Sequence, residues 1–217
     1  MKSFRMLAGA AAALALTAGL AGCASGPAPE ELDQEAVRII RSAFRDEGIA
    51  KVDRLDQDAA NEACSRALGK EPAPEVVKAI EAESLKTIRP PGDGKYLGDW
   101  REGEKIAQSG RGLTFTDDAR VVNGGNCYNC HQISRQEISF GTIGPSLYQY
   151  GRLRGVTDPD SPAARPIIEY TWGKLWNARA YNACSHMPRA GHLGILSEAQ
   201  IRHVMALLLD PKSPVNQ

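Results

Sequence analysis

The feature that most constrains this chain is the pentad Cys127-Tyr128-Asn129-Cys130-His131. In a C-x-x-C-H sequence the two thiols add to the vinyl groups of haem, and the adjacent histidine binds the iron. Two residues between the cysteines, on one helical turn, match the separation of the two vinyl groups. The pentad therefore predicts one covalently attached haem c, held by Cys127 and Cys130, with His131 as an axial ligand of the iron.

Three other kinds of site could use the same cysteines. A structural zinc site needs further ligands and could recruit Cys184 and His186, which form a C-x-H pair. A thioredoxin-like redox pair needs a β-α-β context, and no strand pattern precedes Cys127. A disulfide inside the pentad would leave His131 without a role. The haem interpretation is favoured because the chain also begins with an export signal.

That signal occupies residues 1–22. Lys2 and Arg5 precede an apolar run over residues 6–20, which has the length and alanine-rich composition of a secretory signal peptide. The protein is therefore expected to be periplasmic. Leu20-Ala21-Gly22-Cys23 resembles a lipobox, so Cys23 is expected to carry a lipid and residues 23–29 to form a lipid-anchored tether. The alternative is ordinary cleavage nearby, with Cys23 incidental.

Composition excludes several classes of protein. The 217 residues include 26 Lys+Arg and 26 Asp+Glu, and this balance argues against a nucleic-acid partner. The charged fraction of 24% is ordinary for a globular chain, so general disorder is not expected. No later segment is apolar over the roughly 20 residues that a spanning helix needs. Membrane contact is therefore expected only through the lipid anchor.

Apolar periodicity predicts helices, and no segment alternates as a strand would. Helical patterns cover residues 30–46, 53–68, 74–86, 100–109 and 197–210. The last of these begins with a capping box formed by Ser197 and Gln200. Residues 110–125 and 141–166 are expected to be loops. The predicted fold class is therefore all-α with extensive loops.

A break rich in proline and glycine, at residues 89–94, suggests two parts of the chain. Residues 30–94 are expected to form a helical N-terminal extension, and residues 95–217 the domain that holds the haem. The extension has a single aromatic residue, so it is expected to pack against something else.

The iron needs a sixth ligand or an open position. Met187 lies next to Pro188 on a loop before the last helix, and a thioether ligand would raise the reduction potential, as suits an electron carrier. His186, His192 and an open site are the alternatives, and gap-filling in the core is the ordinary role of a methionine. We expect Met187 to be the second axial ligand.

Two cysteines remain once the lipid and haem thiols are assigned. In an oxidising compartment, Cys64 and Cys184 are expected to form a disulfide between the N-terminal helices and the loop that carries Met187. The alternative is that both are free, or that one is a reactive thiol.

From residue 100 onward the chain resembles a class I cytochrome c, with a first helix, the pentad, a Gly-Pro-Ser-Leu turn, a methionine loop and a closing helix. More narrowly, it resembles the SoxX family, the monohaem subunits of SoxAX cytochromes. The segments that carry this resemblance are residues 124–131, 141–147, 187–189, 209–211 and 213–216. The wider resemblance, from residue 100 to residue 217, covers a little over half of the chain.

The resemblance implies a class I cytochrome c domain and a role in thiosulfate oxidation. SoxAX cytochromes oxidatively join thiosulfate to a cysteine of the SoxYZ carrier protein, an L-cysteine S-thiosulfotransferase reaction thought to occur at a haem of SoxA. By analogy, this chain would pair with a SoxA-like subunit, receive the electrons and pass them to a small soluble cytochrome c. No catalytic residue is expected on this chain alone.

Two other functions stay open at the level of sequence. One is an independent periplasmic lipoprotein cytochrome c that carries electrons to a terminal oxidase or reductase. The other is a haem sensor with an exchangeable sixth position. Basic residues could form a rim that steers an acidic partner, or simply a solvated surface. They are Arg135, Arg152, Arg154, Arg165, Lys174, Arg179 and Arg189.

Overall fold

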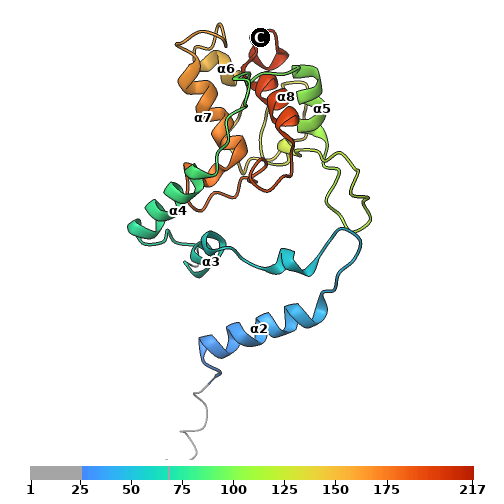
Figure 1. The fold of residues 1–217 in the computed structure, drawn as a ribbon, viewed down its shortest axis with the longest axis vertical. Helices are drawn as coiled ribbons and strands as arrows, with labels where there is room; N and C mark the ends of the chain where they lie inside the picture. Colours follow the sequence, from blue (N-terminus) through green and yellow to red (C-terminus); the bar gives the residue numbers. More distant parts are fainter. Residues whose placement is uncertain (1–25, 68) are drawn as a thin grey trace, which may run out of the picture. The chain divides into compact units, whose positions relative to one another are not determined.

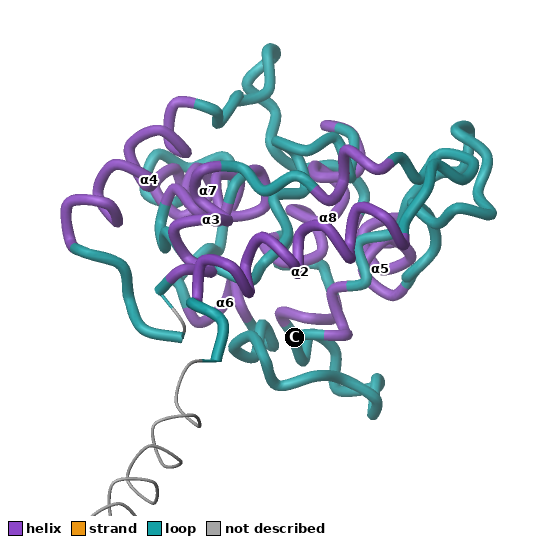
Figure 2. The backbone as a smooth tube through the Cα atoms, turned by 90° about the horizontal axis from the view of Figure 1, so that it is seen from below, coloured by secondary structure: helices purple, strands orange, loops and turns teal. Residues whose placement is uncertain are grey.

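The computed structural model describes residues 26–67 and 69–217 (Figure 1). The expected signal peptide and the expected lipidation site, Cys23, lie outside the described residues. Within them the chain forms helices and loops and no strand (Figure 2), so the predicted all-α class is confirmed for this part of the chain. The only pairing of extended backbone there is an isolated bridge between Glu47 and Ala50. The chain divides after Arg45 into two compact units, which are described separately.

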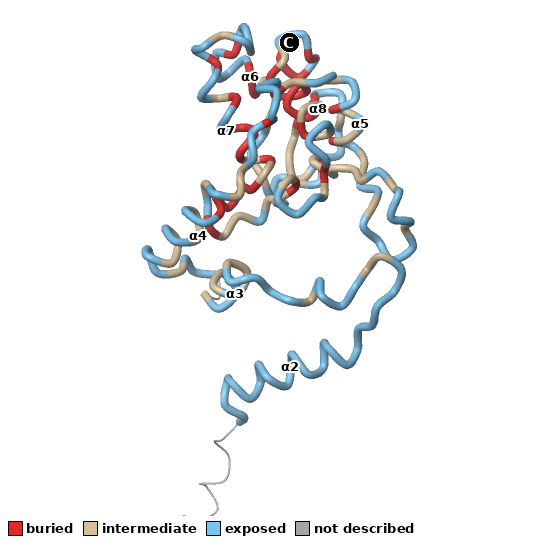
Figure 3. The backbone as a smooth tube through the Cα atoms, in the orientation of Figure 1, coloured by how far each residue is buried: buried red, intermediate tan, exposed pale blue. Residues whose placement is uncertain are grey.

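The described part of the first unit consists mainly of α2, Pro29–Ala43. The proline stands in the first turn, where its missing N–H costs nothing, and the Glu31 carboxylate accepts a hydrogen bond from the Ala28 amide over 3.2 Å. Leu32, Ala36 and Ile39 recur at helical spacing on one side. None of the residues of α2 is buried (Figure 3), so the helix has an apolar stripe that its own unit does not cover.

The second unit contains the remaining elements. They are η1 Val52–Leu55, α3 Ala59–Arg66, α4 Pro74–Lys86, α5 Trp100–Gln108, η2 Cys127–Asn129, α6 Tyr150–Leu153, α7 Arg165–Trp176, η3 Ala178–Ala180, α8 Glu198–Leu209 and η4 Pro214–Asn216. The helices predicted at residues 74–86, 100–109 and 197–210 all form. The predicted helix at 53–68 is two elements, because Asp58 caps α3 through its side chain and so starts a new helix there.

Two α-helices of the described residues were not predicted from the sequence. The short helix α6, Tyr150–Leu153, lies within residues 141–166, which were expected to be loops. α7, Arg165–Trp176, follows a loop rich in glycine, proline and serine, and Pro166 stands in its first turn. Ile168, Thr171, Trp172 and Leu175 are buried along it at helical spacing. This helix leads directly into the segment that carries Met187.

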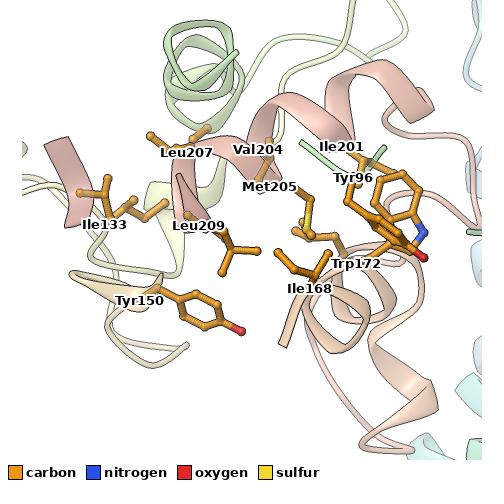
Figure 4. Close-up of a cluster of buried hydrophobic side chains, with 14 of the residues drawn as sticks. Tyr96, Ile133, Tyr150, Ile168, Trp172, Ile201, Val204, Met205, Leu207 and Leu209 are labelled. Atoms are coloured by element: carbon orange, nitrogen blue, oxygen red, sulfur yellow. The ribbon is translucent and has the colours of Figure 1, made fainter. Parts of the chain in front are cut away.

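The core of the second unit lies between α5, α7 and α8 (Figure 4). α5 crosses α8 closely at Gly103, where an added Cβ would lie only 2.1 Å from the carbonyl oxygen of His203. Glycine therefore permits the backbones to approach. α8 is the most buried element, with Ile201, Met205 and Leu209 fully covered. As predicted, Ser197 and Gln200 form its capping box.

Residues 46–94 belong to the same unit as the C-terminal part of the chain. The Trp172 indole of α7 donates to the Arg89 carbonyl over 2.8 Å, and the side-chain Nδ2 of Asn177 donates to the Thr87 hydroxyl over 2.9 Å. The proline-glycine break is a turn in which the Gly94 amide donates to the Pro91 carbonyl over 3.0 Å. This break therefore does not separate two compact units, and the division lies near residue 45 instead.

Candidate functional site

The pentad forms one tight turn. η2 covers the first three residues, and the amides of Cys130 and His131 both donate to the Cys127 carbonyl, over 3.1 and 2.9 Å. Asn126, before the turn, has a φ of 49°, in the left-handed region that asparagine tolerates better than most residues. Both cysteines are half-buried, and neither is in a disulfide. The turn thus holds two reduced thiols and an imidazole within five residues.

A single hydrogen bond fixes the state of the His131 ring. Its Nδ1 lies 2.7 Å from the Pro145 carbonyl oxygen. Because a carbonyl oxygen can only accept, Nδ1 must donate, and the neutral imidazole then has its lone pair on Nε2. A histidine that binds a metal through one ring nitrogen usually donates the N–H of the other to an acceptor, and the Pro145 carbonyl is such an acceptor. His131 is therefore oriented and in the tautomer that can bind a metal through Nε2.

The loop at residues 141–147 packs against the pentad. The Gly144 amide donates to the Cys130 carbonyl over 2.9 Å, and the Gly141 amide donates to the Tyr128 carbonyl over 2.8 Å. A Cβ on Gly144 would lie 2.1 Å from Cε1 of His131. Only glycine allows the backbone this close to the imidazole, so the loop forms a wall beside the ring and carries the Pro145 acceptor to it.

The Cys127 thiol is not activated. Burial raises its pKa to about 11, and the nearby Cys130 and Glu104 add to the effect. Reactive cysteines of redox enzymes have the opposite property, a lowered pKa that exposes a thiolate at neutral pH. Together with the absence of a strand among the described residues, this argues against the thioredoxin-like alternative.

Met187 is half-buried and packs against the hydrophobic core, as Cys127 does. Its amide donates to the Ser185 hydroxyl over 3.2 Å. Its neighbour His186 and the later His192 are both exposed. Of the three candidate sixth ligands, Met187 is therefore the one whose side chain lies against the apolar interior.

Cys64 and Cys184 are joined by a disulfide, with their Cα atoms 5.6 Å apart. The bond links α3 to the segment before Met187, the pairing expected from the sequence. It also removes Cys184 from the ligands that a zinc site could recruit. Among residues 26–67 and 69–217, no group of three or more His, Cys, Asp or Glu side chains could hold a metal ion. The alternative of a structural zinc site therefore lacks the further ligands that it would need besides Cys127 and Cys130.

A polar cavity of about 370 Å³ lies between the end of α4, the end of α7 and the segment after Met187. Its lining residues are Lys86, Thr87, Arg89, Trp176, Gly191 and His192. No acidic side chain lines it, and the Trp176 Nε1 is buried with no hydrogen-bond partner in the described part of the chain. A buried N–H without an acceptor costs about 1–3 kcal/mol. The two basic side chains in the lining, Lys86 and Arg89, give the cavity the charge to receive an anionic group such as a carboxylate.

Apolar side chains are exposed in the segment after the pentad. Ile138 is 91% exposed and Ile143 is 75% exposed, and Phe140 lies between them in sequence. Clustered exposed apolar residues are typical of surfaces that contact another protein.

Two residues of the expected basic rim are not at the surface. The Arg179 and Arg189 side chains are only 10% and 14% exposed, and both form ion pairs with Asp58. Both guanidinium groups are largely buried and share the single Asp58 carboxylate, so these two residues do not form part of an exposed basic rim or of a solvated surface.

Sequence reasoning missed two contributors to this region. The Pro145 acceptor is a backbone atom, so no side-chain pattern could reveal it. Asp58 acts through contacts with residues far away in the sequence. Only the helix-capping position of Asp58 left a local signal.

Comparison with known proteins gives one informative relative. No protein-family model matches the chain. A protein of Aquifex aeolicus (strain VF5), named as an uncharacterized lipoprotein, is 31% identical over 218 positions, which cover 94% of this chain and 97% of the relative. In the described residues, no helix has both the length and the apolar character to cross a membrane. The similarity extends over nearly the full length of both proteins, and the chain belongs to the same family as this Aquifex lipoprotein.

Proposed function

We propose that this protein is a c-type monohaem electron-transfer protein, with Cys127 and Cys130 as the thioether positions and His131 and Met187 as the axial ligands. The observation that carries the proposal is the hydrogen bond from His131 Nδ1 to the Pro145 carbonyl, in a turn that also holds two reduced thiols. The bond leaves Nε2 free for iron, which is the state that the pentad chemistry requires.

Bound haem c would supply a one-electron Fe(III)/Fe(II) couple. The chain's own residues would bind and orient the group. Pro145 and Gly144 hold the His131 ring in place. The raised pKa of the Cys127 thiol keeps it protonated at neutral pH until it would form the thioether. Lys86 and Arg89, which line the polar cavity, would receive the haem carboxylates.

A class I cytochrome c domain of the SoxX type is the more specific part of the proposal. Two of the segments that resemble SoxX, residues 124–131 and 141–147, are joined by the hydrogen bonds from Gly141 and Gly144, and the residues that flank them make further bonds. The Leu147 amide donates to the Gln132 carbonyl over 2.7 Å, and the Gln149 amide donates to the Val215 carbonyl over 2.9 Å. The Asn216 side chain accepts from the Gly151 amide over 2.9 Å. These bonds bring the turn next to the pentad and the tail next to the residues that follow the turn, an arrangement compatible with a single haem-binding domain.

On this proposal the protein works as the electron outlet of a thiosulfate-oxidising SoxAX-like complex. It pairs with a SoxA-like cytochrome that acts on a SoxYZ-like carrier protein, and it passes electrons to a small soluble cytochrome c. The exposed Ile138 and Ile143, after the pentad, provide an apolar surface for such a partner.

A second candidate is an independent lipoprotein cytochrome that serves a terminal oxidase or reductase. The name of the Aquifex relative favours it, since a lipid anchor suits a carrier that works at a membrane. In either case we propose that the chain is exported to the periplasm and anchored through Cys23. A Cys23→Ser variant should move from the membrane fraction to the soluble fraction and lose labelling by a fatty-acid analogue.

The first test is the intact mass of the full-length protein made in a host that matures c-type cytochromes. One covalent haem per chain is expected, and it should be absent from the Cys127→Ala/Cys130→Ala variant. The Cys64→Ala/Cys184→Ala variant is the matched control and should keep the haem. A wild-type protein with no covalent haem, or with bound zinc, would overturn the proposal.

The second test separates the two candidates. Purification from the native envelope should recover a second haem protein with this chain, and removal of the chain should abolish thiosulfate-dependent reduction of a soluble cytochrome c. A monomer reduced only through a quinol-dependent pathway would favour the independent carrier.

A further inference from the structure

One carboxylate holds both ends of the segment that carries Met187, which we term the Met187 loop (residues 179–189). Asp58 Oδ1 lies 3.1 Å from Arg179 Nη1, and Asp58 Oδ2 lies 2.6 Å from Arg189 Nη2. Arg179 begins the loop, and Arg189 stands two residues after Met187. The two oxygens of a single side chain therefore bridge the two ends of the loop.

The same short helix makes two further attachments to the loop. Asp58 caps α3 by accepting from the Asn61 amide over 2.7 Å, and the Asn61 side-chain oxygen accepts a hydrogen bond from Arg179. Cys64, in the middle of α3, forms the disulfide to Cys184, three residues before Met187. The contacts from α3 thus fall at the start, the middle and the end of the loop.

These contacts are not ordinary surface ion pairs. The two arginine side chains are 10% and 14% exposed, whereas the Asp58 carboxylate is 40% exposed. Surface pairs contribute little because water screens them and the side chains lose entropy. A buried guanidinium that loses its carboxylate is much less favourable, because its charge stays desolvated without a partner. Loss of Asp58 would therefore release the loop ends rather than leave them in place.

We propose that α3 is a latch on the Met187 loop, with Asp58 and the Cys64–Cys184 disulfide as positioning groups that favour Met187 as the axial ligand. This inference rests on the proposed haem function. A thioether is a neutral, weak donor, so its occupancy at iron depends on how much loop freedom is lost when it binds. A loop already held at both ends loses less. Opening the latch should therefore favour competing ligands and lower the reduction potential, because methionine ligation raises it.

The test uses the full-length holoprotein with Asp58→Asn, which keeps a helix-capping side chain but removes the charge. Imidazole, which must displace Met187 from ferric iron, should bind this variant about tenfold more tightly than the wild type. The reduction potential should fall, while covalent haem content and the disulfide stay unchanged. Asp58→Glu should restore part of the wild-type behaviour.

The matched control is Glu62→Gln on the same helix. Glu62 pairs with Arg66 over 3.0 Å, and both side chains are more than half exposed. This variant removes a charge and an ion pair from α3 without touching the Met187 loop, and its imidazole affinity should equal that of the wild type.

Two further variants keep the inference falsifiable. Arg189→Gln removes only the ion pair between Arg189 and Asp58 and keeps the one between Arg179 and Asp58. It is tested in place of Asp58→Asn if that variant does not accumulate. In a Met187→Ala background, Asp58→Asn should have no further effect on imidazole binding, because there is no thioether to displace. An unchanged affinity in Asp58→Asn, or an effect that persists without Met187, would overturn the latch. A wild-type protein without haem would instead overturn the proposed function.

Discussion

At the scale of single residues, His131 depends on an atom without side-chain chemistry. The Pro145 carbonyl sets its tautomer, and Gly144 is the residue that lets the backbone reach the ring. The pentad alone predicts haem attachment, but it does not say what holds the imidazole. The structure identifies that support in the loop at residues 141–147, which resembles SoxX.

Gly144→Ala should disturb this support. Its Cβ would lie 2.1 Å from the His131 ring, so the ring or the loop must move, at a cost of about 1–3 kcal/mol in unfolding free energy. Denaturant unfolding of the purified protein measures the loss. Gly92→Ala is the control, since an added Cβ there meets nothing within 4 Å. Equal stability of the two variants would show that the structure accommodates a Cβ at position 144 without strain.

On the proposed function, Met187→Ala should convert the haem iron to a high-spin state and lower its reduction potential, because a thioether ligand raises the potential by favouring ferrous iron. Absorption spectra and a redox titration measure both changes. His186→Ala, at an exposed position next to Met187, should leave the spectrum unchanged. A wild-type spectrum in Met187→Ala would mean that another residue binds the iron.

At the scale of elements, sequence reasoning succeeded where the signal is local. α4, α5 and α8 have regular apolar spacing and clear starts, and the pentad is contiguous, so each could be predicted from its own residues. α7 was missed because its apolar residues follow a long run of loop-forming residues. The contacts of Asp58 join positions 121 apart, which no local pattern can reveal.

The contribution of Asp58 to the stability of the fold depends on pH, because its carboxyl group ionises. Burial raises the pKa of this carboxyl, but the Asn61 amide, Arg189 and Arg179 together outweigh burial and hold the pKa below its ordinary value. A carboxyl with a lowered pKa stabilises the fold above its unfolded-state pKa of about 4, and the effect is lost as the pH falls through the folded value.

Asp58→Asn should therefore lower the unfolding free energy at neutral pH by about 1–3 kcal/mol, less than for a fully buried pair because the carboxylate is 40% exposed. The difference from the wild type should shrink below about pH 4. Urea unfolding at several pH values measures it. A constant difference across that range would contradict the role of the charge.

At the scale of the whole molecule, the division after Arg45 has a direct consequence for truncation. Because α2 has no buried residue, a chain that begins at Asp46 should unfold at a temperature close to that of the full chain. A chain that begins at Tyr96 loses α3, α4 and the disulfide, and it should unfold at a much lower temperature. Thermal unfolding followed by circular dichroism compares them. Equal melting of the two truncated chains would place residues 46–95 outside the cooperative unit.

The position of the disulfide also constrains the order in which disulfide formation and haem attachment can take place after export. Its partners lie 120 positions apart, and the intervening chain contains both pentad cysteines. A chain exported from its amino end presents Cys64 to Cys127 and Cys130 before Cys184 has crossed the membrane. Oxidation in order of arrival would join the wrong thiols. On the proposed function, cells must therefore either load the prosthetic group first or repair mispaired bridges with an isomerase.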